Sequence, residues 1–105
     1  MKKIFIFILL VLAISNGKTA AQGINFEHGT WQETLDKARA EGKIVFLDAY
    51  TSWCGPCKLL SRNTFPDSAV GVFFNQHFVC AKIDMEKGEG PKLAEQFSVN
   101  VYPTL

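Results

Sequence analysis

The sequence predicts an α/β fold in one domain, because strand-like apolar runs alternate with helical patterns along most of its 105 residues. The clearest run is "KIVFLDAY", in which residues 44–47 are continuously apolar, as in a central strand that is covered on both faces. A second strong strand-like run, "FVCAKID", follows at residues 78–84. Helical patterns lie around and between these two runs, which implies at least one parallel crossover.

The first predicted elements are a short strand and a helix. "INFEH", residues 24–28, can form the strand. "TWQE" is typical of a capping box, with Thr30 as N-cap and Glu33 three residues later. Apolar residues then recur along one face of a helix that ends near Gly42. These residues are Trp31, Leu35 and Ala38.

Three more helical segments follow the first long strand. "CKLLSRNTF" is predicted to be helical until Pro66 interrupts it. "DSAVGVFFNQ" starts a new helix with Asp67 or Ser68 as its cap, and "PKLAEQF" forms a short helix with Pro91 in its first turn. In the second of these helices, three apolar side chains are expected to point inward: Val70, Phe73 and Phe74. Four phenylalanines are interpreted as core residues: Phe65, Phe73, Phe74 and Phe78.

Residues 1–21 do not fit this domain and are predicted to be a signal peptide. Two lysines precede an 11-residue apolar run, "IFIFILLVLAI", and the small-residue sequence "TAA" suits cleavage after Ala21. A membrane-spanning helix needs about 20 apolar residues, although an uncleaved N-terminal anchor is the alternative. We therefore expect residues 22–105 to be an exported domain with no membrane insertion after cleavage. It would be periplasmic if the source is a Gram-negative bacterium.

The charge of residues 22–105 argues against two classes of partner. Eight basic and ten acidic residues remain after the first 21 are removed, so the net charge is −2. Nucleic-acid binding usually requires a clustered basic face, and the sequence contains no basic block. Binding to an anionic membrane surface is disfavoured for the same reason.

Cys54 and Cys57, in "WCGPCK", are the candidate reactive residues. A Cys-x-x-Cys beside a β-α pattern indicates a redox motif. A helix that starts at Cys54 would stabilise a thiolate there through its free N–H groups and its dipole. Cys57, one helical turn later, would then resolve a mixed disulfide. Gly55 keeps the turn free of a side chain over the sulfur, and Pro56 is tolerated early in a helix.

Metal binding and a purely structural disulfide explain this pair less well. A closed zinc site needs four ligands, and only Cys80, His28 and His77 remain as further candidates, without a second paired spacing. A disulfide that closes so short a loop constrains the unfolded chain little. Cys80 lies in an apolar strand-like run and is interpreted as a core residue rather than a second redox thiol.

The hexapeptide "WCGPCK", residues 53–58, resembles the active-site sequence of the thioredoxin family. The resemblance extends over residues 31–105. It implies a thioredoxin-like three-layer α/β/α sandwich that needs no cofactor and no metal. The segment "TFPDSAVGVFFNQHFV" is longer than in small cytosolic thioredoxins. In this respect the chain is similar to exported thioredoxin-like proteins and to the C-terminal domain of the thiol:disulfide interchange protein.

The resemblance assigns catalytic roles to three residues. Cys54 would attack the substrate and form a disulfide with Cys57, and Asp48, six residues before Cys54, would be the buried acid that moves protons to and from the second cysteine. Burial in an apolar run would raise the pKa of Asp48, unless this residue is an aspartate at a solvent-exposed edge. Lys82 matches the lysine that often neighbours the acid, although a strand lysine can also simply reach solvent.

Three further residues are expected to bind substrate. Trp53 would form a platform beside the reactive sulfur. "YPT" matches the cis-proline loop of the family, which would place Pro103 across from Cys54. The backbone beside this proline pairs with extended substrates in the family. Tyr102 would face the substrate groove at a position where thioredoxins often have an aliphatic residue or threonine.

Only Thr104 and Leu105 follow the expected cis-proline loop. In the thioredoxin fold two strands and a helix come after this loop, so we expect a fold truncated there, with residues 44–50 as an exposed apolar edge. The expected function is a protein-disulfide reductase, with disulfide-containing proteins as substrates and an upstream electron donor. The alternatives are a non-catalytic binding module or inactive fragment, or a disulfide isomerase or oxidant.

Overall fold

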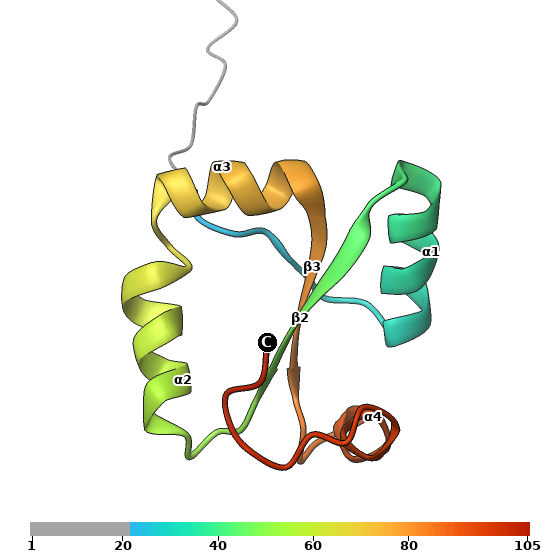
Figure 1. The fold of residues 1–105 in the computed structure, drawn as a ribbon, viewed down its shortest axis with the longest axis vertical. Helices are drawn as coiled ribbons and strands as arrows, with labels where there is room; N and C mark the ends of the chain where they lie inside the picture. Colours follow the sequence, from blue (N-terminus) through green and yellow to red (C-terminus); the bar gives the residue numbers. More distant parts are fainter. Residues whose placement is uncertain (1–21) are drawn as a thin grey trace, which may run out of the picture.

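The computed structural model describes residues 22–105 and arranges them in three layers, with helices on both faces of a central sheet (Figure 1). The sheet contains β1 (Phe26–Glu27), β2 (Ile44–Tyr50) and β3 (Phe78–Asp84) in the order β1-β3-β2, and both neighbouring pairs are parallel. The parallel crossover predicted from the sequence is therefore confirmed. The predicted signal peptide lies outside the described residues. No helix within residues 22–105 has the length and apolarity needed to cross a membrane.

Helices α1 (Trp31–Glu41) and α4 (Gly90–Gln96) lie on one side of the sheet (Figure 1). The predicted caps of α1 are confirmed: the Thr30 hydroxyl accepts a hydrogen bond from the Glu33 amide at 3.1 Å, and Gly42 ends the helix with a φ of +64°. These caps fix where the chain leaves α1 and enters β2.

The opposite side of the sheet carries α2 (Gly55–Leu59), a π-helical turn η1 (Leu60–Thr64) and α3 (Ser68–His77). The side chain of Asp67 caps α3 by accepting a hydrogen bond from the Val70 amide at 3.0 Å. The predicted interruption between the two helical segments is therefore confirmed. The π-helical widening at the end of the first segment was not predicted.

Aromatic rings fill the space between the sheet and α3. The ring of Phe46 on β2 lies 4.8 to 6.4 Å, centroid to centroid, from three other phenylalanine rings: Phe65, Phe74 and Phe78. The expectation that Phe73 also points inward is wrong, because its side chain is 52 % exposed and stacks on His77. Successive residues of a helix point about 100° apart, and in α3 it is the Phe74 ring that packs against Phe46 on the sheet.

A second cluster packs β2 and the end of β3 against α4. Its buried members are Ala49, Met85 and Leu93. Trp31 from α1 packs against this cluster, as the predicted apolar face of that helix requires. Cys80, in the middle of β3, is 2 % exposed and unpaired, so its predicted place in the core is confirmed.

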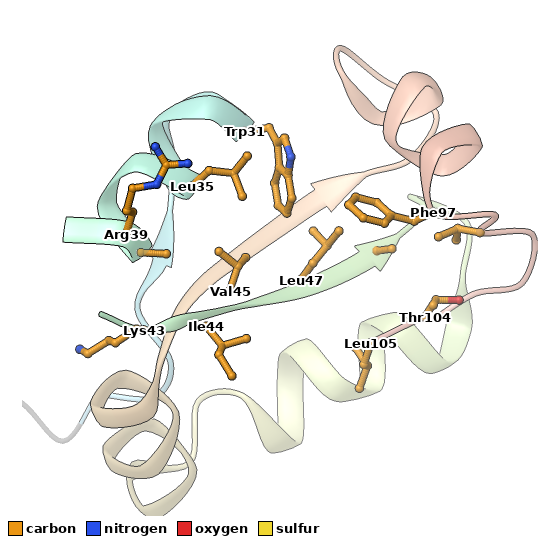
Figure 2. Close-up of a pocket in the computed structure, with 13 residues that line it drawn as sticks. Trp31, Leu35, Arg39, Lys43, Ile44, Val45, Leu47, Phe97, Thr104 and Leu105 are labelled. Atoms are coloured by element: carbon orange, nitrogen blue, oxygen red, sulfur yellow. The ribbon is translucent and has the colours of Figure 1, made fainter. Parts of the chain in front are cut away.

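β2 lies at the edge of the sheet, as predicted, and Ile44 at its start is 73 % exposed. Near its other end, Ala49 and Thr104 form an antiparallel bridge with N···O distances of 2.9 and 3.1 Å. A groove of about 630 Å³ follows this edge, and most of the side chains that line it are apolar (Figure 2). Neither Cys54 nor Cys57 lines this groove.

Candidate active site

Cys54 and Cys57 form a disulfide at the start of α2, with their Cα atoms 5.3 Å apart. Cys54 is the N-cap of this helix, and its sulfur accepts a hydrogen bond from the Cys57 amide at 3.2 Å. An amide donor and the positive end of the helix both favour negative charge on this sulfur once the disulfide is reduced. Both residues are only 3 % exposed.

The two residues between the cysteines suit the start of a helix. Pro56 occupies one of the first two helical positions, as predicted. A Cβ added at Gly55 would meet no atom within 4 Å outside its two chain neighbours and the backbone of its own helix. The surface beside the disulfide is therefore uncrowded at this point, which leaves room for a substrate.

Asp48 lies on β2, six residues before Cys54, with an exposed fraction of 0 %. Its side chain is on the same face of the strand as Phe46, the face that α2 and α3 cover. Neither carboxylate oxygen has a hydrogen-bond partner. Burial raises the pKa of Asp48 to about 6, and the charge of Lys82 offsets part of this rise. The predicted burial of this acid is confirmed.

Lys82 on β3 is directly opposite Asp48 in the strand register. Its ammonium group nevertheless donates a hydrogen bond to the hydroxyl of Ser61, on the π-helical turn η1, and lies 5.0 Å from the centre of the Tyr50 ring. The lysine charge therefore acts on Asp48 only through space. The role of Lys82 as a support of the acid stays a prediction.

Trp53 and Tyr102 meet beside the disulfide. Their ring centres are 5.9 Å apart at an interplanar angle of 86°, and Trp53 is 64 % exposed. The indole N–H of Trp53 donates to Glu86 at 2.6 Å, which fixes the orientation of the ring. The peptide bond between Tyr102 and Pro103 is cis, as predicted. The position of Pro103 across from Cys54 stays a prediction.

Three residues of the site were not found from the sequence. Ser61 and Glu86 hold predicted site residues through side-chain hydrogen bonds, and Thr51 is 1 % exposed with no partner for its hydroxyl. Thr51 directly follows the strand that carries Asp48, and this position is the one feature of the sequence that could have indicated its place in the site. Within residues 22–105, no group of three or more His, Cys, Asp or Glu side chains could hold a metal ion.

The family can now be assigned from comparison with known proteins. The model of the family Thioredox_DsbH, described as "Protein of unknown function, DUF255", matches residues 18–102. The chain belongs to this thioredoxin-like family. The thioredoxin-like fold expected from "WCGPCK" is thus confirmed, and so is membership of a family of thiol–disulfide oxidoreductases.

Named relatives of this DsbH-type chain agree with that assignment. It is 35 % identical over 77 residues to the thiol:disulfide interchange protein DsbD of Pseudoalteromonas atlantica, covering 71 % of this chain and 13 % of DsbD. It is also 35 % identical over 74 residues to thioredoxin of Chlamydia trachomatis, covering 70 % of this chain and 66 % of that thioredoxin. The chain spans only part of these relatives, from 7 % of spermatogenesis-associated protein 20 of Mus musculus to 66 % of the Chlamydia thioredoxin.

A solved structure supports the fold directly. The solution structure of a candidate disulphide-isomerase from Bacteroides thetaiotaomicron is 49 % identical in sequence and superposes with a TM-score of 0.68. The match covers 78 % of this chain and 68 % of that one. Both sequence and backbone therefore place the DsbH-type chain among thioredoxin-like proteins.

Proposed function

We propose that this DsbH-type chain is an exported thiol–disulfide oxidoreductase that reduces disulfides in protein substrates. The observation that carries the proposal is the Cys54–Cys57 disulfide at the start of α2, with the buried acid Asp48 on the strand that leads to it. The sequence Gly-Pro between the cysteines resembles the reducing members of the thioredoxin family. Reduction is therefore favoured over oxidation.

The proposed reaction transfers two electrons from the protein dithiol to the substrate. The Cys54 thiolate attacks one sulfur of the substrate disulfide, whose S–S bond breaks, and the other substrate sulfur leaves as a thiolate. Cys57 then loses its proton and attacks the Cys54 sulfur. This step forms the Cys54–Cys57 disulfide and releases the second substrate sulfur, which takes up a proton. A dithiol electron donor must reduce the protein again before the next cycle.

Asp48 is the proton acceptor for Cys57 in this scheme. A carboxylate with a pKa of about 6 is mostly ionised at neutral pH and is still a stronger base than an ordinary exposed aspartate. Because neither of its oxygens has a hydrogen-bond partner, the carboxylate is free to accept a proton. Proton transfer to Asp48 would raise the thiolate fraction of Cys57 at the moment of attack.

The exposed Trp53 and the half-buried Tyr102 would bind the polypeptide around the substrate disulfide. Trp53 and Tyr102 form an edge-to-face pair beside the cysteines, and the cis bond before Pro103 shapes the adjoining loop. The backbone next to Pro103 would pair with an extended substrate segment, as in other β-strand additions. Disulfides in extended or unfolded chains are the substrates that suit this surface.

The test is reduction of insulin by the protein in the presence of dithiothreitol. Cys54→Ser should abolish activity, Cys57→Ser should accumulate mixed disulfides visible on non-reducing gels, and Cys80→Ser should behave like the wild type. Full activity of Cys54→Ser would end the proposal. The Cys80→Ser control shows whether the loss of activity in Cys54→Ser is specific to the reactive sulfur or follows the removal of any thiol.

Disulfide isomerisation is a second candidate, favoured by the 49 % identical relative that is described as a candidate disulphide-isomerase. Isomerisation needs only the attacking cysteine, because a thiol of the substrate can resolve the mixed disulfide. With scrambled ribonuclease as substrate, an isomerase would retain activity in Cys57→Ser. A reductase would lose it.

Export is supported by the pattern of residues 1–21, which begins with two lysines and ends in small residues. Expression of the full chain in a Gram-negative host tests it. Mass spectrometry of the periplasmic fraction should find a protein that begins at Gln22. Recovery from the cytoplasm alone with the first residues intact would contradict export.

A further inference from the structure

A basic pocket of about 410 Å³ opens beside Cys57, on the side of the sheet that α2 covers. The end of β2, helix α2, the turn η1 and strand β3 contribute its walls. The lining residues that matter here are Ser52, Cys57, Lys58, Ser61, Arg62 and Lys82. The pocket is thus continuous with the disulfide, and Trp53 and Tyr102 do not line it.

The charge of this pocket is positive and largely uncompensated. Lys58, Arg62 and Lys82 line it, whereas no aspartate or glutamate does. Within the part of the chain that the structure describes, Lys58 and Arg62 are exposed and take part in no ion pair and no side-chain hydrogen bond. Lys82 donates to the neutral hydroxyl of Ser61. The buried Asp48 opposite Lys82 offsets at most one of the three charges.

We propose that this pocket is a subsite for a carboxylate side chain of the substrate. The acidic residue would lie next to the substrate cysteine that Cys54 attacks. The inference rests on the proposed function, because it concerns which protein disulfides the same site selects. A polypeptide whose disulfide sits at Cys54 passes within a few residues of the pocket, since Cys57 forms part of the pocket wall. Arg62 can offer two parallel N–H groups to a carboxylate, and the flexible Lys58 adds a second charge.

A negative charge lies near Trp53, which does not line the pocket. Glu86 accepts the hydrogen bond of the Trp53 indole, so an acidic substrate residue at this ring would meet a like charge. The acidic residue of the substrate is therefore favoured at the pocket and disfavoured at the Trp53 ring. The positive charge of the pocket and the negative charge at Trp53 thus select both the substrate and its orientation.

The experiment compares two synthetic peptides, each with one intramolecular disulfide, that differ only in Glu or Gln beside one cysteine. The full chain should reduce the Glu peptide with a kcat/KM about five-fold higher at low ionic strength. The preference should fall towards one in about 0.5 M salt, because salt screens the partly exposed cations. Arg62→Gln and Lys58→Gln should each lower the ratio, and the double variant should abolish it.

Lys92→Gln is the matched control, because it removes the same charge from an exposed position on α4 that does not line the pocket. It should keep the full preference. The rate with the Gln peptide reports whether each variant is folded and active, and the ratio of the two rates isolates selectivity. Equal rates for both peptides, or a preference that survives the double variant, would overturn the subsite and leave the proposed function intact. Failure to reduce either peptide would instead contradict the proposed function and the subsite with it.

Discussion

Asp48 and Lys82 face each other on neighbouring strands, and yet no hydrogen bond joins their side chains. The ammonium group of Lys82 donates to Ser61, whereas the carboxylate of Asp48 is fully buried without a donor. A buried carboxylate in this situation favours its protonated form, which is why its pKa rises to about 6. The site therefore contains a carboxylate that takes up a proton near pH 6, closer to neutral pH than an ordinary aspartate.

Ionised Asp48 should destabilise the fold, so Asp48→Asn should stabilise it at high pH. The pKa of about 6 in the folded protein exceeds the ordinary value of 3.8, so between these pH values the folded protein binds more protons than the unfolded chain. Stability therefore falls as the pH rises from about 4 to 6 and stays lowered above. At pH 8 we expect Asp48→Asn to gain on the order of 2 kcal/mol in urea unfolding of the oxidised protein.

The control for this prediction is Glu95→Gln, which removes a carboxylate from an exposed position on α4. It should leave the free energy of unfolding within about 0.5 kcal/mol of the wild type at every pH. The gain from Asp48→Asn should shrink as the pH approaches 4. A gain that does not depend on pH would show that the effect comes from packing and not from the charge.

Removal of the Lys82 charge should raise the pKa of Asp48 further. The lysine charge lowers this pKa at present, although burial outweighs it. In Lys82→Met, the carboxyl carbon signal of Asp48 in an NMR titration should therefore reach its midpoint at a higher pH than in the wild type. Lys92→Met, which changes an exposed lysine on α4, should leave the midpoint in place. An unchanged midpoint in Lys82→Met would show that the lysine charge does not affect the pKa of Asp48.

Gly90 should not tolerate a side chain, because α4 begins in contact with the backbone at the end of β3. A Cβ at Gly90 would lie 1.9 Å from the Asp84 carbonyl oxygen and 2.6 Å from the Met85 Cα. We expect Gly90→Ala to cost about 3 kcal/mol in urea unfolding. Gly55→Ala, at a helical position where the Cβ meets no such atom, should change stability by less than about 1 kcal/mol. Equal costs for the two variants would contradict this packing.

Cys80 should resist alkylation in the native protein. Its thiol is buried in β3, and burial raises its pKa to about 11, so almost no thiolate forms at pH 8. With the Cys54–Cys57 disulfide intact, iodoacetamide should label no cysteine until denaturant is added, as measured by intact mass. Rapid labelling of one thiol in native buffer, absent from Cys80→Ser, would overturn the core interpretation of this residue.

Local patterns in the sequence predicted most of the secondary structure. The caps Thr30 and Gly42 marked α1, and the apolar run at residues 44–47 marked β2, because these signals depend on neighbouring residues alone. The cis bond before Pro103 followed from the resemblance carried by "YPT" and "WCGPCK". The helical pattern did not indicate that only Phe74, and not Phe73, points towards the sheet, because both residues are apolar and adjacent.

The partners of the site residues could not be predicted in the same way. Ser61 is 21 residues from Lys82, and Glu86 is 33 residues from Trp53, and each pair meets only after the strands and helices have packed. The spacing of apolar residues does not distinguish the π-helical turn that carries Ser61 from an ordinary α-helix. The basic pocket likewise draws its cations from α2, η1 and β3, so no basic run in the sequence indicates it.

A redox titration of the protein, followed by Trp53 fluorescence against a dithiol buffer, tests the central claim most directly. Trp53 directly precedes Cys54, so reduction of the disulfide changes its surroundings. We predict one two-electron transition with a midpoint near the value of about −270 mV that is typical of thioredoxin. A midpoint near about −120 mV, typical of a strong oxidant, or no transition at all, would contradict a reductase.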